Sequence, residues 1–126
     1  MHTSESPEIQ CGHEIKSVEE AHFAVLYGCI YADDEVSHQE NDRLVHLFYN
    51  SGMFKGIGLM STWEHMRHLM FKYGEEVLVS SALSKLPGEM GRMLISEVRG
   101  LLISDGELSE SEKQFLKRLE SKINVN

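Results

Sequence analysis

Apolar residues recur every three or four positions in several stretches of this 126-residue chain. That spacing places them on one face of an α-helix, and no stretch shows the sustained period-two alternation that marks a strand. The helical stripes begin near positions 17, 37, 61, 77, 90 and 109. We therefore predict an all-α fold, a compact single-domain bundle of about six to seven helices.

Capping and turn residues separate these stripes. In the pattern Ser-x-x-Glu, the hydroxyl and the carboxylate cap free backbone N–H groups, so the pattern predicts where a helix begins. It occurs at Ser17, Ser37, Ser61 and Ser109. Gly74 and Pro87 predict breaks between helices. Residues 1–16 are polar and are predicted as an N-terminal arm, loose or with a short helical turn, before a helical domain over 17–126.

One helix-corner-helix unit occurs twice in the chain. The stretch "LYGCIYADDEVSHQENDRLVHL", residues 26–47, aligns without a gap with residues 98–119, at an offset of 72 positions. The shared pattern at the corner is D-x-E-[VL]-S-x-x-E, and apolar positions on both sides also match. We expect the apolar stripes of the two units to lie in the core. Their members are Ala24, Gly28, Leu44, Leu47, Val98, Leu102, Leu116 and Leu119.

The two corners carry much of the chain's negative charge. Nine of its 20 acidic residues lie within residues 33–42 and 105–112. Capping explains the serines and the final glutamates, but Asp33 and Asp105 come near helix carboxyl ends, where a carboxylate is disfavoured by roughly 0.3–1 kcal/mol. A divalent cation, Ca²⁺ or Mg²⁺, would relieve that cost. The candidate metal ligands are Asp33, Glu35, Glu40, Asp105, Glu107 and Glu112. Screening of exposed carboxylates by solvent and salt is an equally weighted alternative.

These corners resemble those of the TerB-like family, which is named for a tellurite-resistance protein. The residues that carry the resemblance are "ADDEVSHQE" and "SDGELSESE", within a similarity that spans about residues 20–122. The resemblance implies an all-helical fold, divalent-cation binding through the acidic corners and a role in stress-response or membrane-associated complexes. The first corner departs from the family pattern, because Asp34 stands where glycine is usual.

Composition narrows the choice of partners. The formal net charge is −8, and the basic residues are scattered singly, which excludes nucleic acid as an expected partner and favours a protein with a basic surface. No apolar run approaches the ~20 residues of a membrane span, and the N-terminus lacks a signal peptide. With only Cys11 and Cys29, neither in a CxxC pair, we expect a cytoplasmic protein.

No complete catalytic constellation is present in the sequence. His65 and His68 can share a helix face, but zinc would need two further ligands, and an exposed polar face is the favoured interpretation. His22 and His46 lie on predicted helices, where they would be pH-sensitive or solvated. The leading expectation is a non-enzymatic module that binds a divalent cation, a protein or both. The alternative is a metal-dependent hydrolase that uses the acidic corners.

Overall fold

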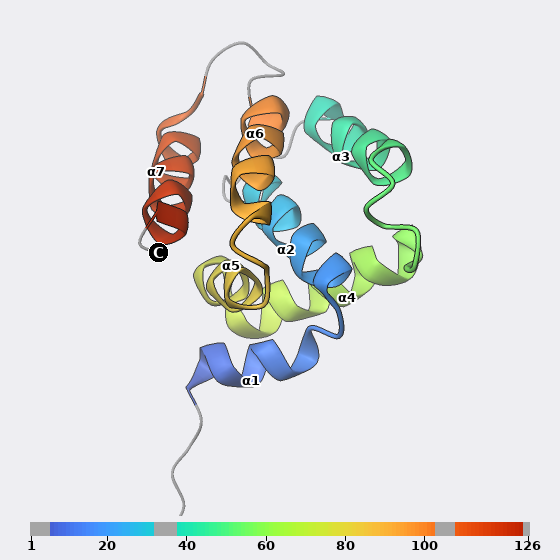
Figure 1. Ribbon diagram of the computed structural model, residues 1–126, viewed down its shortest axis with the longest axis vertical. Helices are drawn as coiled ribbons and strands as arrows, with labels where there is room; N and C mark the ends of the chain where they lie inside the picture. The colour runs from blue at the N-terminus through green and yellow to red at the C-terminus, as the bar shows by residue number, and fades with distance from the viewer. Residues whose placement is uncertain (1–5, 32–37, 103–107, 125–126) are drawn as a thin grey trace, which may run out of the picture.

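The computed structural model describes residues 6–31, 38–102 and 108–124 (Figure 1). These residues contain seven helices and no strand, so the all-α prediction is confirmed. The helices are α1 (Pro7–Glu14), α2 (Val18–Ile30), α3 (His38–Asn50), α4 (Leu59–Tyr73), α5 (Glu75–Ser84), α6 (Met90–Leu102) and α7 (Glu110–Asn124).

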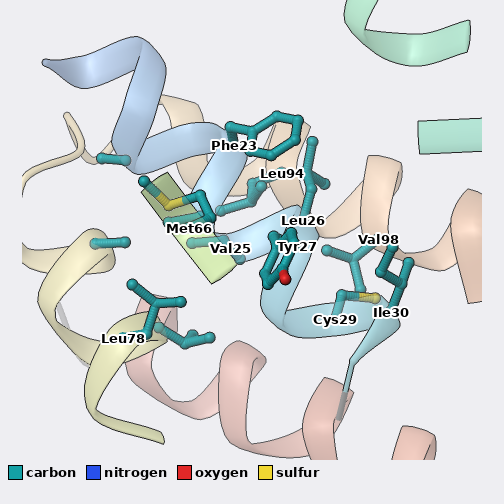
Figure 2. Close-up of a cluster of buried hydrophobic side chains, with 14 of the residues drawn as sticks. Phe23, Val25, Leu26, Tyr27, Cys29, Ile30, Met66, Leu78, Leu94 and Val98 are labelled. Atoms are coloured by element: carbon teal, nitrogen blue, oxygen red, sulfur yellow. The ribbon is translucent and has the colours of Figure 1, made fainter. Parts of the chain in front are cut away.

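Helix α2 is the centre of the bundle. Every residue from Ala21 to Ile30 is buried, and α3, α4, α5 and α6 all contact this helix. Figure 2 shows why: the side chains of α2 meet Met66 of α4, Leu78 of α5 and Leu94 of α6 in one continuous apolar cluster. A helix that is apolar on all sides is stable in water only when it is enclosed in this way.

Seven of the eight residues expected in the core are buried. Ala24, Leu44, Val98 and Leu102 are at most 1% exposed, and Gly28, Leu116 and Leu119 are also buried. Leu47 is the exception, because its side chain is only partly buried and lies in the wall of a pocket between α3 and α6.

The helix boundaries follow the internal repeat. Helices α2 and α6 end at Ile30 and Leu102, and α3 and α7 begin at His38 and Glu110, so both boundaries keep the offset of 72 positions. An unbroken helix through either corner is therefore excluded. This agreement supports the interpretation of the two units as a structural repeat.

Capping was predicted correctly at two described helix starts and wrongly at a third. Ser17 caps α2, because its hydroxyl accepts a hydrogen bond from the N–H of Glu20 at 3.1 Å. Helix α4 begins at Leu59 after Gly58, not at Ser61. Ser61 lies in the first turn, where its hydroxyl donates to the Gly58 carbonyl at 3.3 Å.

The segment expected to be a polar arm contains α1, which packs against α4 and α5. Cys11 and Ile15 bring its apolar side into the core, with exposed fractions of 0% and 2%. Ser81 of α5 donates its hydroxyl to the carbonyl of Glu8 at 2.9 Å. Cys11 and Cys29 are both buried free thiols.

Candidate functional site

The acidic corners are described only in part. Asp33, Glu35, Asp105 and Glu107 lie outside the described residues, and so does the predicted cap Ser37. Among the described residues, no group of three or more His, Cys, Asp or Glu side chains is placed to hold a metal ion. The assignment of these carboxylates as metal ligands therefore stays a prediction.

Glu112 has a clear structural role. It exchanges two hydrogen bonds with Ser109: the N–H of Ser109 donates to Oε1 of Glu112 at 2.8 Å, and the N–H of Glu112 donates to the Ser109 hydroxyl at 3.2 Å. This is the complete capping box that the sequence predicts at the start of α7. The Glu112 side chain is 8% exposed, so most of its carboxylate surface is committed to this turn.

Glu40 and Glu112, which match in the repeat, approach the same buried thiol. The pKa of Cys29 is raised well above its usual value, first by burial and then by the negative charges of Glu40, Glu112 and Glu75. Glu40 is only 3% exposed. Both glutamates therefore lie close enough to Cys29, near the carboxyl end of α2, for their charges to act on its thiol.

A pocket of about 500 Å³ opens between α3 and α6, which lie side by side in the upper part of Figure 1. Its lining residues are Asp42, Arg43, His46 and Leu47 of α3 and Glu97, Gly100 and Leu101 of α6. Leucine side chains supply apolar wall, while the charged groups of α3 are exposed at the rim. Pockets of this size, mostly apolar with a few polar groups, are typical ligand sites.

One polar residue of the pocket wall, Glu97, pairs with a side chain of the core. Nε2 of His22, on α2, lies 2.5 Å from Oε1 of Glu97. The His22 side chain is 0% exposed and that of Glu97 is 15% exposed. A buried imidazole destabilises the folded state unless it is hydrogen-bonded. The contact with Glu97 offsets this cost for His22.

The surroundings of His22 favour one tautomer of its ring. Its second ring nitrogen, Nδ1, is buried without a hydrogen-bond partner among the described residues, and the ring edge contacts Phe54 with 5.5 Å between centroids. An unpaired acceptor is tolerated better than an unpaired N–H donor in a protein interior. Of the two tautomers of the imidazole, the arrangement therefore favours the one in which Nε2–H donates to Oε1 of Glu97.

The pocket carries a net negative charge. Asp42 and Glu97 contribute two carboxylates, Arg43 contributes one guanidinium, and the imidazole of His46 is counted as neutral. Asp42 and Arg43 are exposed to solvent, which screens their charges, whereas the Glu97 carboxylate lies in a less polar setting where its charge acts more strongly.

Sequence reasoning did not find this site. Of the two possibilities for His22, pH-sensitive or solvated, the second is wrong, because the side chain is fully buried, and no sequence pattern singles out Glu97. The one available signal was the position of His22 between Ala21 and Phe23 in the apolar run of α2. The partner lies 75 residues away, so no local pattern could join the two.

His65 also has a structural role. Its Nε2 lies 2.7 Å from the carbonyl oxygen of Glu14, at the carboxyl end of α1, and 3.7 Å from Oε1 of Glu20. The imidazole thus ties α4 to the connection between α1 and α2. His68, three residues later, is exposed and lines a separate shallow pocket with Phe71.

Comparison of the chain with protein-family models, with curated proteins and with solved structures finds no match in any of the three. None of the helices in the described part of the chain is both long and apolar enough to cross a membrane. The findings therefore define an all-helical protein, with seven helices among the described residues, and they assign it to no family.

Proposed function

We propose that the chain is a non-enzymatic binding module that holds a segment of a partner protein with a basic surface in the α3–α6 pocket. The observation that carries this proposal is the Glu97 carboxylate, presented to a pocket of about 500 Å³ and fixed by a fully buried histidine. The net charge of −8 adds long-range attraction for basic surfaces.

The polar pair itself argues for a function. An apolar side chain in place of His22 would fill the same core without the cost of burying an imidazole. Departures from an apolar core are concentrated at functional sites, where a polar group has a second purpose. For His22, the purpose we propose is to orient the carboxylate of Glu97, a residue that lines the pocket.

Peptide display tests this proposal without assuming the chemistry of the ligand. A random peptide library is selected on the wild-type chain and counter-selected on Gly100→Trp, in which the indole occupies the pocket. Gly100 lines the pocket and no described atom lies within 4 Å of an added Cβ, so the variant can fold. Ser121→Trp, on the exposed surface of α7, is the control. Peptides that need an open pocket support the proposal, and their absence overturns it.

A second function is proposed for the acidic corners: binding of Ca²⁺ or Mg²⁺ as in the TerB-like family, with a role in stress response. The observation in its favour is that Glu40 and Glu112, the matching glutamates of the two patterns, both raise the pKa of the buried Cys29 thiol and so lie near the same side chain. The alternative function is metal-dependent hydrolysis by the same carboxylates. A hydrolase would turn over a test ester in the presence of Mn²⁺, and Asp33→Asn and Asp105→Asn would abolish that turnover. Metal binding without turnover would support the binding function and contradict the hydrolase.

A further inference from the structure

We infer that Glu97 is the recognition residue of the α3–α6 pocket, that it binds the cationic head of a lysine or arginine side chain, and that His22 is its positioning residue. The inference rests on the proposed function and names the chemical group that the pocket selects. Three features of the pocket carry it: its charge, the fixed orientation of Glu97 and its apolar walls.

The first feature is the charge. One negative charge remains when Arg43 is set against Asp42 and Glu97 and the imidazole of His46 is counted as neutral. Glu97 is the carboxylate with the least solvent around it, so an incoming cation interacts with Glu97 more strongly than with the exposed Asp42. An anionic ligand would meet repulsion at the same place.

The second feature is preorganisation. The contact of 2.5 Å to His22 anchors one oxygen of Glu97, and the imidazole is itself buried in the core, where it packs against Phe54. A flexible surface glutamate must lose side-chain entropy when it binds a ligand. Glu97 has already lost much of that freedom, which leaves more of its interaction energy for binding.

The third feature is the wall of the pocket. Leu47 and Leu101 line it with apolar surface, and Gly100 places no side chain in it. Lysine and arginine carry a charged head on an aliphatic stem, and such stems bury well along apolar surface. A metal ion or a small inorganic cation would leave that surface without a partner.

The test uses blocked pentapeptides with alanine at four positions and arginine, lysine or citrulline at the centre. Citrulline has the shape of arginine without its charge. Each peptide is titrated into the ¹⁵N-labelled full chain, and the amide signals of Leu47, Glu97 and Leu101 are followed. The arginine or the lysine peptide should bind at least tenfold more tightly than the citrulline peptide. Equal binding of all three would overturn the inference.

Three variants assign the effect to its residues. Glu97→Gln should abolish the preference for the cationic peptide and leave citrulline binding within threefold of wild type. Asp42→Asn should weaken cation binding less than threefold, because Asp42 is exposed. Arg43→Gln should strengthen cation binding, since it removes a like charge, and it involves no buried group. An unchanged preference in Glu97→Gln would overturn the inference, and so would weaker cation binding in Arg43→Gln.

The role of His22 has its own test. His22→Gln keeps an N–H donor for Glu97 and should retain most of the cation preference, whereas His22→Met, of similar size, should lose it while the chain stays folded by circular dichroism. Equal cation preferences in these two variants would overturn the positioning role. If all three peptides bind alike and Gly100→Trp blocks them, only this inference fails. If no peptide binds at the pocket, the proposed function fails with it.

Discussion

Gly28 and Gly100 occupy matching positions in the internal repeat but face different surroundings. A Cβ added at Gly28 would lie 2.5 Å from Cγ2 of Val79, because α2 and α5 pack closely at this point. A Cβ added at Gly100 would meet no described atom within 4 Å. The same residue type therefore permits close helix packing in one unit and leaves the α3–α6 pocket open in the other.

Alanine at these two positions should change the free energy of unfolding in opposite directions. Gly28→Ala should destabilise the chain by about 1–2 kcal/mol, since overpacking against a stiff, buried valine outweighs the gain in helix propensity. Gly100→Ala should stabilise it by about 0.5 kcal/mol, since a helical glycine is replaced without a clash. Urea unfolding of each variant and of the wild type measures both changes in the free energy of unfolding.

The double variant Gly28→Ala with Val79→Ala is the control for the first of these effects. Removing the Cγ atoms of Val79 removes the clash, so the two substitutions should be less destabilising together than their separate effects predict. Additive effects would show that contact with Val79 is not the cause of the destabilisation by Gly28→Ala.

Gly74 joins α4 to α5 in a backbone conformation that side chains avoid. Its φ is 89° and its ψ is 164°, a region that is essentially restricted to glycine. Gly74→Ala should therefore destabilise the chain by roughly 1–3 kcal/mol, although no described atom lies within 4 Å of the added Cβ. Chemical unfolding tests this. Unchanged stability would mean that the junction can adopt another conformation at no cost.

Local signals predicted the start of α7 correctly. Ser109 and Glu112 form the predicted capping box because both partners lie within one turn, where three-residue spacing decides the geometry. The same pattern failed at Ser61, because Leu59 and Met60 are good enough helix residues to extend α4 back to Gly58. A capping pattern therefore indicates where a helix can start, but the helix begins earlier when the preceding residues have sufficient helix propensity.

The pocket could not be predicted in the same way. Leu47 continues the apolar stripe of α3, and its match in the repeat, Leu119, is 1% exposed. Leu47 is only partly buried because α3 and α6 leave a pocket beside it. Periodicity identifies the inward face of a helix but not how closely its neighbour packs. The distance between helices depends on contacts that are remote in sequence.

The carboxylate of Glu14 should make the stability of the chain pH-dependent. Tyr73 donates a hydrogen bond to Oε2 of Glu14 at 2.5 Å and Lys72 donates one at 3.0 Å, and both lower the pKa of Glu14. A pKa that is lower in the folded state gives stability that is present above the unfolded pKa of about 4.3 and is lost as the pH falls through the folded pKa.

Glu14→Gln should accordingly destabilise the chain at pH 7 and have a smaller effect near pH 3. Melting temperatures at both pH values measure the difference. Tyr73→Phe removes the hydrogen bond that lowers the pKa most, so in that background the effect of Glu14→Gln should depend less on pH. The same loss of stability at both pH values would mean that the charge of Glu14 is not responsible.

The acidic corners lead to the last prediction, which separates a cation site from screened surface charge. Asp33→Asn with Asp105→Asn keeps the side-chain shape and removes two charges that follow the ends of α2 and α6 in the sequence. A carboxylate near a helix carboxyl end is disfavoured by the macrodipole. Without metal, the double variant should be as stable as wild type or slightly more stable. Calcium or magnesium at a hundred times its dissociation constant should stabilise the wild type by about 2.7 kcal/mol and the variant hardly at all. Melting curves of chelator-treated protein with and without each metal provide the measurement.

A control variant, Glu8→Gln with Glu89→Gln, removes two exposed charges outside the corners and should retain the metal response. If the wild type shows no metal-dependent shift at millimolar calcium, magnesium or manganese, the cation proposal fails, and the corner carboxylates remain a surface for a basic protein partner.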